Sequence, residues 1–239
     1  MALFGPYTGD SSSSEAYAIG VHWKEKLGYK VVEGSGFYGH FFGGQTWELP
    51  LCPSCRQPLQ QILTFDLNDP ALLELKVGGL SELPLVSCLN CSYCWEPQAF
   101  RLIVPENKVQ IVDQWDDQDW RMDEEDRLPV PLPQTSMKLE RMTEDDLPID
   151  EDCFELALER FGREQICRIL GAPLYLTDPI DRQCPGCGSE MIYAAQIIED
   201  DYTQKPPLIS VVDFKLGELV LYFSLCPSCL ILKTEMQGT

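Results

Sequence analysis

The sequence predicts an α+β fold that is mainly β, arranged as an internally duplicated, pseudo-twofold scaffold with two zinc knuckle sites of four cysteines each. Three observations lead to this prediction. The chain contains four Cys-x-x-Cys motifs in two pairs, and each pair supplies the four thiolates that a closed tetrahedral metal site requires. The segments that flank the two pairs resemble each other. Apolar runs of strand length connect the two motifs of each pair.

Eight cysteines are the predicted metal ligands, in two groups with similar internal separations. Proline occupies the second position of three of the four motifs and sets the turn, while Gly186 and Gly188 relax the backbone where it folds tightly. We expect one structural zinc ion in each group. The ligands are Cys52, Cys55, Cys88 and Cys91 in the first group, and Cys184, Cys187, Cys226 and Cys229 in the second.

The three remaining cysteines leave one alternative open. Because Cys94 follows Cys91 at the same spacing, either Cys88 and Cys91 or Cys91 and Cys94 complete the first site. Alignment with the second group favours Cys88 and Cys91. Cys153 and Cys167 are expected to be small core residues rather than ligands.

The repeat extends beyond the cysteines. Leu59 and Met191 each stand four residues after the second cysteine of a motif, and each begins a segment of strand length. An apolar run leads into the second Cys-x-x-Cys motif of each pair, over residues 83–88 in the first half and 220–226 in the second. Each half is therefore predicted to be a hairpin-like unit that one ion clamps where strands meet knuckles.

We divide the chain into an N-terminal half, residues 1–112, a linker, residues 113–150, and a C-terminal half, residues 151–239. The glycine-rich loop 34–39 is expected to be a tight turn, because it lacks the Gly-x-Gly-x-x-Gly form of a phosphate loop. A helix is predicted from Asp150 to about Phe161. The expected strands are 29–32, 59–67, 99–104 and 108–112, with a short helix or turn at 70–77 that Asp69 begins.

The linker is acidic, contains two tryptophans, and includes a proline-rich run. It is either a solvated spacer, or an arm that binds a partner, or a segment whose tryptophans tuck under the C-terminal half. As an arm, its aromatic side chains would anchor in pockets while its carboxylates meet Lys or Arg. The residues of this predicted arm are Trp115, Asp116, Asp117, Asp119, Trp120, Asp123, Glu124, Glu125 and Asp126.

The composition favours a basic protein as partner. The chain has 38 acidic and 18 basic residues and a formal net charge of −20. Such a surface repels nucleic acid and anionic membranes, because phosphate binding depends on Lys and Arg. No apolar run reaches the length of a membrane span, and the start of the chain does not have the form of a signal peptide. We therefore expect a cytoplasmic protein with reduced, metal-binding cysteines.

The sequence indicates a non-enzymatic protein. A catalytic zinc usually keeps an open position, and four cysteines close each predicted site. His40 is expected to be a surface histidine or a satisfied core histidine, and nothing indicates a Cys-His nucleophile pair with His22 or His40. Common hydrolase and nucleotide-binding motifs are missing. A tetrathiolate site also suits iron, so a rubredoxin-like electron-transfer protein is an alternative of another class.

The motif order in both halves carries a resemblance. A Gly-Gly or Gly-Ala pair, an aromatic residue, Cys-x-x-Cys, a strand with a Gln, and a second Cys-x-x-Cys resemble the YwqG-type bacterial family of uncharacterised proteins. The pattern is also similar to the programmed cell death protein 2 family of zinc-knuckle modules. The first resemblance implies a pseudo-twofold fold and an immunity protein, or antitoxin, that neutralises a toxin domain. The second implies a chaperone of a basic ribosomal protein. The likeness covers about residues 40–104 and 165–235, and the first half departs from it at Gln45 and Thr46.

Overall fold

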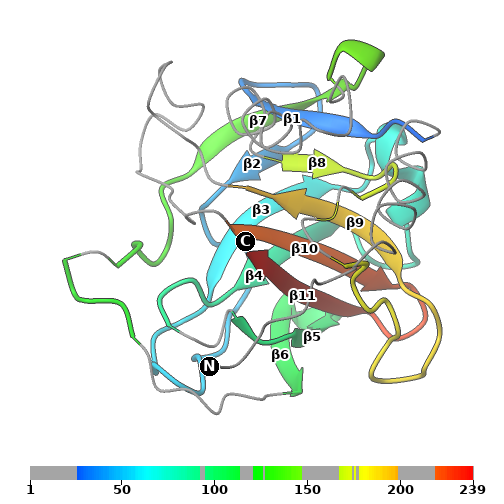
Figure 1. Cartoon of the computed structure of the whole chain (residues 1–239). Helices are drawn as coiled ribbons and strands as arrows, with labels where there is room; N and C mark the ends of the chain where they lie inside the picture. The colour runs from blue at the N-terminus through cyan, green and yellow to red at the C-terminus, as the bar shows by residue number, and fades with distance from the viewer. Residues whose placement is uncertain are drawn as a thin grey trace, which may run out of the picture.

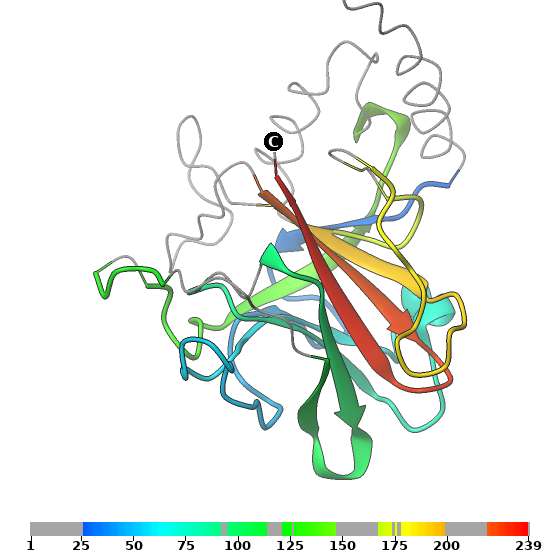
Figure 2. The same ribbon diagram turned by 60° about the horizontal axis from the view of Figure 1, so that its bottom comes forward.

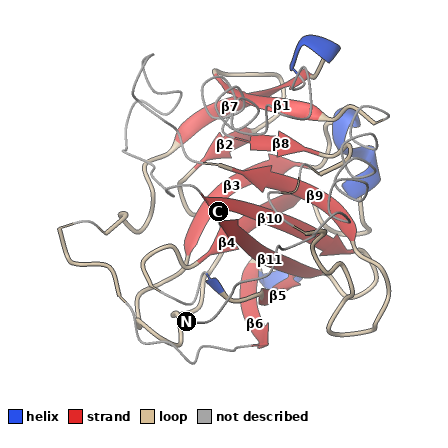
Figure 3. Ribbon diagram, in the orientation of Figure 1, coloured by secondary structure: helices blue, strands red, loops and turns tan. Residues whose placement is uncertain are grey.

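The computed structural model describes residues 26–91, 95–113, 121–125, 127–146, 167–173, 175, 178–198 and 219–238. These residues form one antiparallel sheet of eleven strands that curls into a half-barrel, with short 3-10 helices beside it (Figures 1 and 3). The prediction of a mainly β fold is confirmed. The elements are β1 (Tyr29–Glu33), β2 (His40–Phe42), β3 (Gln60–Asp66), η1 (Pro70–Leu75), β4 (Glu82–Ser87), β5 (Gln98–Ile103), η3 (Val104–Glu106), β6 (Lys108–Asp113), β7 (Thr135–Arg141), η4 (Glu144–Asp146), β8 (Cys167–Ile169), β9 (Ile192–Ile197), β10 (Leu219–Cys226) and β11 (Ile231–Gly238).

The order of strands in the sheet is β4-β3-β2-β7-β1-β8-β9-β10-β11-β5-β6. The pair β7–β1 joins two groups of strands, with β2, β3 and β4 following on one side and β8, β9 and β10 on the other. β1, from the N-terminal half, also pairs with β8 of the C-terminal half, while β7, from the stretch between the halves, also pairs with β2 of the N-terminal half. The two halves therefore share one continuous sheet.

The core lies inside the curl of the sheet, between β2–β4 and β8–β11 (Figure 2). Side chains alternate between the two faces of each strand, so every second residue points inward. Leu221, Phe223 and Leu225 of β10 are fully buried on this inner face, together with Leu63 and Phe65 of β3. A smaller apolar cluster that includes Tyr193 and Tyr222 covers the outer face of the second half.

The pairings of the two halves follow the same register. Phe42 pairs with Thr135 on one side and Leu63 on the other. Ile169 likewise pairs with Tyr29 and with Ala195. Both hairpins also carry a β-bulge at the same distance after the second cysteine, at Ile62 in β3 and at Ala194 in β9. The carbonyl oxygen of each bulge residue accepts a hydrogen bond at 2.8 Å, from Gly43 N–H to Ile62 and from Leu170 N–H to Ala194.

The stretch predicted as a linker contains an inner strand of the sheet. Residues Thr135–Arg141 form β7, which pairs with β1 over five positions and also with β2. The prediction of a linker over 113–150 is therefore wrong for this part. The physical reason is that Met137 is fully buried and Leu139 packs against the core, while Lys138 and Glu140 face outward and pair with each other. This alternation was not recognised as a strand because it is short. An acidic and a proline-rich segment precede it, and further acidic residues follow it.

Other predicted elements agree with the structure. The strands at 29–32, 59–67, 99–104 and 108–112 correspond to β1, β3, β5 and β6 within a residue or two. The Asp69 carboxylate caps η1 by accepting a hydrogen bond from Ala71 N–H at 2.8 Å. The helix predicted from Asp150 to Phe161 lies outside the described residues. Among the helices that the structure describes, none combines the length and apolarity needed to cross a membrane.

Candidate metal centres

Both four-cysteine groups assemble at the ends of antiparallel strand pairs. In the first half, one knuckle precedes β3 and the other follows β4, and these strands pair with each other. In the second half, one knuckle precedes β9 and the other begins at the last residue of β10. Because the strands run in opposite directions, the start of one lies beside the end of its partner. The two knuckles of each pair therefore face each other.

The first group consists of Cys52, Cys55, Cys88 and Cys91, whose Sγ atoms all lie within 4.8 Å of one another. Cys52 and Cys91 are separated by 3.6 Å, Cys55 and Cys88 by 3.6 Å, and Cys88 and Cys91 by 3.4 Å. Zinc–sulfur bonds of about 2.3 Å in a tetrahedron place the sulfurs about 3.8 Å apart. The four thiols therefore fit one tetrahedral metal ion.

The second group consists of Cys184, Cys187, Cys226 and Cys229, again within 4.8 Å of one another. Cys187 and Cys226 are 3.7 Å apart, which also matches a tetrahedral edge. Gly186 lies against this group, since a Cβ atom there would lie 3.5 Å from the Cys229 sulfur and 2.7 Å from Ile231 Cδ1. The small residue predicted to relax the turn also makes room for the sulfurs.

The first knuckle of each pair folds in the same way. Arg56 N–H donates to the Cys52 carbonyl at 3.0 Å, and Gly188 N–H donates to the Cys184 carbonyl at 2.8 Å. Both donors adopt a left-handed backbone, with φ of 62° at Arg56 and 72° at Gly188. This conformation turns the chain back into the next strand after the second sulfur. Leu230, after the last knuckle, repeats it with φ of 51°.

The thiols within each group shift one another's pKa values. Hydrogen bonds from Cys88 and Cys91 lower the pKa of Cys52 to about 2, and the contact with Cys52 raises the pKa of Cys88 far above its ordinary value. Hydrogen bonds from Ser189 lower the pKa of Cys187 to about 6, while the contact with Cys187 raises the pKa of Cys229 to about 12. A cation among the sulfurs would stabilise all four thiolates together, because metal binding favours deprotonated ligands.

Three amide side chains form hydrogen bonds that support the second Cys-x-x-Cys motif of the first group, residues 88–91. Gln98 Oε1 accepts a hydrogen bond from Cys88 N–H at 3.4 Å, and Gln60 Oε1 accepts one from Leu89 N–H at 3.0 Å. The buried side chain of Asn90 bonds both to the carbonyl of Leu128 and to its N–H, at 3.0 and 2.9 Å. These supporting residues were not predicted. The signal that could have found them is a polar amide within or beside an otherwise apolar run.

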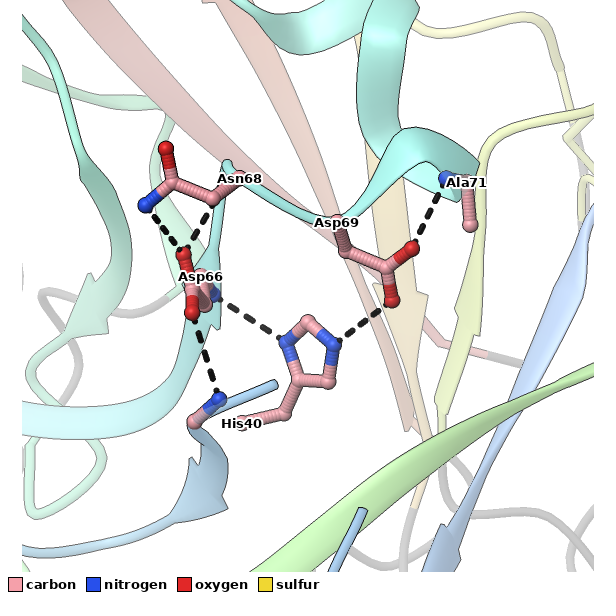
Figure 4. Close-up of polar contacts among 6 residues, drawn as sticks. His40, Asp66, Asn68, Asp69 and Ala71 are labelled. Carbon is pink, nitrogen blue, oxygen red and sulfur yellow. Dashed lines mark hydrogen bonds and ion pairs between the residues drawn. The ribbon is translucent and has the colours of Figure 1, made fainter. Parts of the chain in front are cut away.

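His40 is a satisfied core histidine, which is one of the two placements predicted for it. It lies at the start of β2, is buried, and its Nδ1 accepts a hydrogen bond from Asp66 N–H at 3.1 Å (Figure 4). Its Nε2 therefore carries the proton and donates to Asp69 at 3.0 Å. Burial alone would raise the pKa of Asp66, but hydrogen bonds from Asn68 and Gly39 outweigh this effect and lower it.

Only some of the remaining predicted site residues lie in the part of the chain that the structure describes. Cys167 is buried in β8, in agreement with its predicted core position. Asp123, Glu124 and Glu125 of the predicted arm are exposed. The other members of the arm, and also Cys94, Cys153 and His22, lie outside the described residues. The structure groups Cys88 and Cys91 with the first pair of cysteines, which is the assignment that alignment of the two halves favours.

Comparison of the chain with models of known protein families, with curated proteins and with solved structures finds no significant match. The resemblance to the YwqG-type and programmed cell death protein 2 families therefore stays a prediction.

Proposed function

We propose that the protein is a non-enzymatic, zinc-stabilised binding module, in which each four-cysteine group holds one structural zinc ion. The observation that carries this proposal is the closure of both groups by four sulfurs at tetrahedral separations. Four thiolates leave no position on the metal for water or substrate. The buried histidine in the described part of the chain uses both ring nitrogens in hydrogen bonds, which supports a structural role for it as well.

We infer that the two halves arose by internal duplication. Support comes from the matching strand registers, the matching bulges at Ile62 and Ala194, and the same knuckle hydrogen bonds after Cys52 and Cys184. In this arrangement β1 begins the first repeat and β7 begins the second, and each of them pairs with a strand of the other repeat. A duplicated scaffold with two clamped hairpins is suited to presenting a surface rather than enclosing a reaction.

The partner is proposed to be a basic protein. A net charge of −20 favours such a partner, and the ion pairs of the described surface already occupy many of its Lys and Arg side chains. Examples are the contacts of Lys26 with Glu74 at 2.7 Å and of Lys108 with Glu48 at 2.6 Å. Carboxylates therefore remain in excess, and they would attract a cationic surface.

The sharper form of the proposal is an immunity protein that neutralises a toxin domain by direct binding, as the YwqG-type resemblance implies. The alternative is a chaperone of a basic ribosomal protein. Capture from extracts of the native cell, followed by mass spectrometry, distinguishes a toxin domain from a ribosomal protein. The identity of the neighbouring gene gives an independent answer.

The predicted arm is tested with the captured partner after purification. We expect the double variant Trp115→Ala, Trp120→Ala to keep its fold and lose at least about tenfold in affinity, because buried aromatic anchors concentrate binding energy. Phe37→Ala is the control, since Phe37 is an aromatic residue outside the arm with 95% of its surface exposed. Isothermal titration at two salt concentrations provides the measurement. Unchanged affinity in the double variant would remove the arm from the proposal.

Iron is the second candidate metal, and one observation favours it at the second group. Cys187 is exposed there, and a metal near the surface is what electron transfer requires. Metal analysis and a visible spectrum of the purified chain decide between the two metals. We expect a colourless protein with two zinc ions per chain. A red protein with a rubredoxin-like spectrum would establish the electron-transfer alternative instead.

A further inference from the structure

We propose that the second four-cysteine group is a redox-reactive metal site, in which Cys187 and Cys229 are oxidised to a disulfide and the metal is released. The first group keeps its metal under the same conditions. This inference rests on the proposed occupancy of both groups by zinc, and it assigns the two sites different roles. The first is permanent, and the second responds to oxidants.

Exposure separates the two groups. In the first, Cys52, Cys88 and Cys91 are fully buried, and Cys55 is half-buried. In the second, Cys187 is exposed and Cys229 is half-buried. Oxidation of a thiolate follows its exposure and its nucleophilicity, and metal-bound sulfurs are thiolates. An oxidant can therefore reach the sulfur of Cys187, whereas the buried sulfurs of the first group are shielded.

The two groups also differ in the amide side chains that support their cysteines through hydrogen bonds. Gln60, Gln98 and Asn90 hold the answering knuckle of the first group through its backbone or through the segment at Leu128. The position of Gln60 in β3 corresponds to Ile192 in β9, which has no amide to offer. Loss of outer supporting contacts typically weakens metal binding about 10- to 100-fold.

The chemical step uses hydrogen peroxide as a two-electron oxidant. The Cys187 thiolate attacks one peroxide oxygen, the O–O bond breaks, and a sulfenic acid and a hydroxide ion form. The Cys229 thiolate then attacks the Cys187 sulfur, forms the S–S bond and displaces a second hydroxide ion. Solvent protons convert both hydroxide ions to water. Only the thiolates of Cys184 and Cys226 would then remain to hold a metal, and two ligands would be too few to retain it.

The two sulfurs are placed for this bond. They belong to opposite knuckles, and all four sulfurs of the group lie within 4.8 Å of one another. The disulfide would connect the segment before β9 to the segment after β10, so a covalent bond would replace the metal as the clamp of this hairpin. The first group would hold its own hairpin unchanged.

The test uses the full-length chain after its metal content has been measured. Hydrogen peroxide is added, and released zinc is followed with a chromogenic chelator. We expect one equivalent to leave at least about tenfold faster than the other, and peptide mapping at the end of the fast phase to show a Cys187–Cys229 disulfide. Equal rates, or a first disulfide among the cysteines of the first group, would overturn the inference. A chain without metal at the start would instead overturn the proposed function.

Matched variants assign the two phases. Cys187→Ser is expected to remove the fast phase, and Cys55→Ser, at the corresponding position of the first group, to remove the slow phase only. Gln98→Ala is expected to speed zinc release in the slow phase, because it removes the hydrogen bond that Gln98 accepts from Cys88 N–H in the first group. If a cysteine variant fails to fold, differential alkylation of the unmodified chain during the fast phase still shows which group loses its metal first. Labelling confined to the first group would contradict the inference.

Discussion

At the scale of single residues, buried polar side chains form hydrogen bonds between elements that could not be predicted from the sequence. His40 joins the start of β2 to the end of β3 and to the first turn of η1, through Asp66 N–H and the Asp69 carboxylate. Gln61 similarly accepts hydrogen bonds from the N–H groups of Thr46 and Trp47, both at 3.2 Å. Most buried polar groups in proteins have hydrogen-bond partners, because an unpaired one is costly.

The first residue-scale prediction concerns His40→Ala. The substitution leaves Asp66 N–H without its acceptor and removes the donor to Asp69, so we expect the free energy of unfolding to fall by about 1–3 kcal/mol. Lys108→Ala is the control, because it breaks an exposed ion pair and should leave stability nearly unchanged. Chemical denaturation with metal present measures both variants. Equal stabilities for the two would show that the His40 contacts contribute nothing.

At the scale of elements, left-handed backbone positions decide where strands end. Gly43 and Gly44 follow β2 with φ of 65° and 69°, and Leu170 and Gly171 follow β8 with φ of 57° and 77°. Each pair turns the chain away from the sheet directly after the hydrogen bond to a bulge residue. The neighbouring segment approaches closely, since a Cβ atom at Gly43 would overlap the carbonyl oxygens of Pro133 and Leu132. Only glycine fits there.

The corresponding prediction concerns Gly43→Ala. The new methyl group meets backbone atoms that cannot move aside, and alanine is strained at this φ, so we expect a loss of at least about 2 kcal/mol in unfolding free energy. Gly39→Ala is the matched control in the loop before β2, because a Cβ atom there meets nothing within 4 Å. Thermal unfolding of both variants, followed by circular dichroism, gives the comparison. A variant at Gly43 as stable as the one at Gly39 would contradict the steric argument.

At the scale of the whole molecule, one sheet runs through both halves. β1 comes from the start of the described chain and yet supports β8, while β7 follows the first half and supports β2. The first half thus contributes β1 to the strands of the second half, and the stretch between the halves contributes β7 to those of the first. Neither hairpin with its metal group is an independent domain, which is why the division into two halves and a linker describes the order of the chain better than its packing.

Much of the fold could be predicted because its signals are local. Alternating or continuous apolar runs located β1, β3, β5 and β6, and Asp69 marked the start of η1. The strand β7 was missed because its alternation is short and lies between segments of unusual composition. The pairing of β1 with β7 and β8 could not be predicted, since it depends on contacts between residues far apart in the chain.

The sequence alone determined the pairing of sulfurs within each knuckle, because a Cys-x-x-Cys turn brings two sulfurs together through local backbone geometry and requires no distant contact. It also determined the acidic character of the protein. Only the tertiary structure decided that the two groups are unequal. Cys55 is half-buried and Cys187, at the corresponding position, is exposed, because different segments pack over the two knuckles, and amide side chains such as Gln98 act across strands. Long-range packing therefore distinguishes two sites that the local motifs make alike.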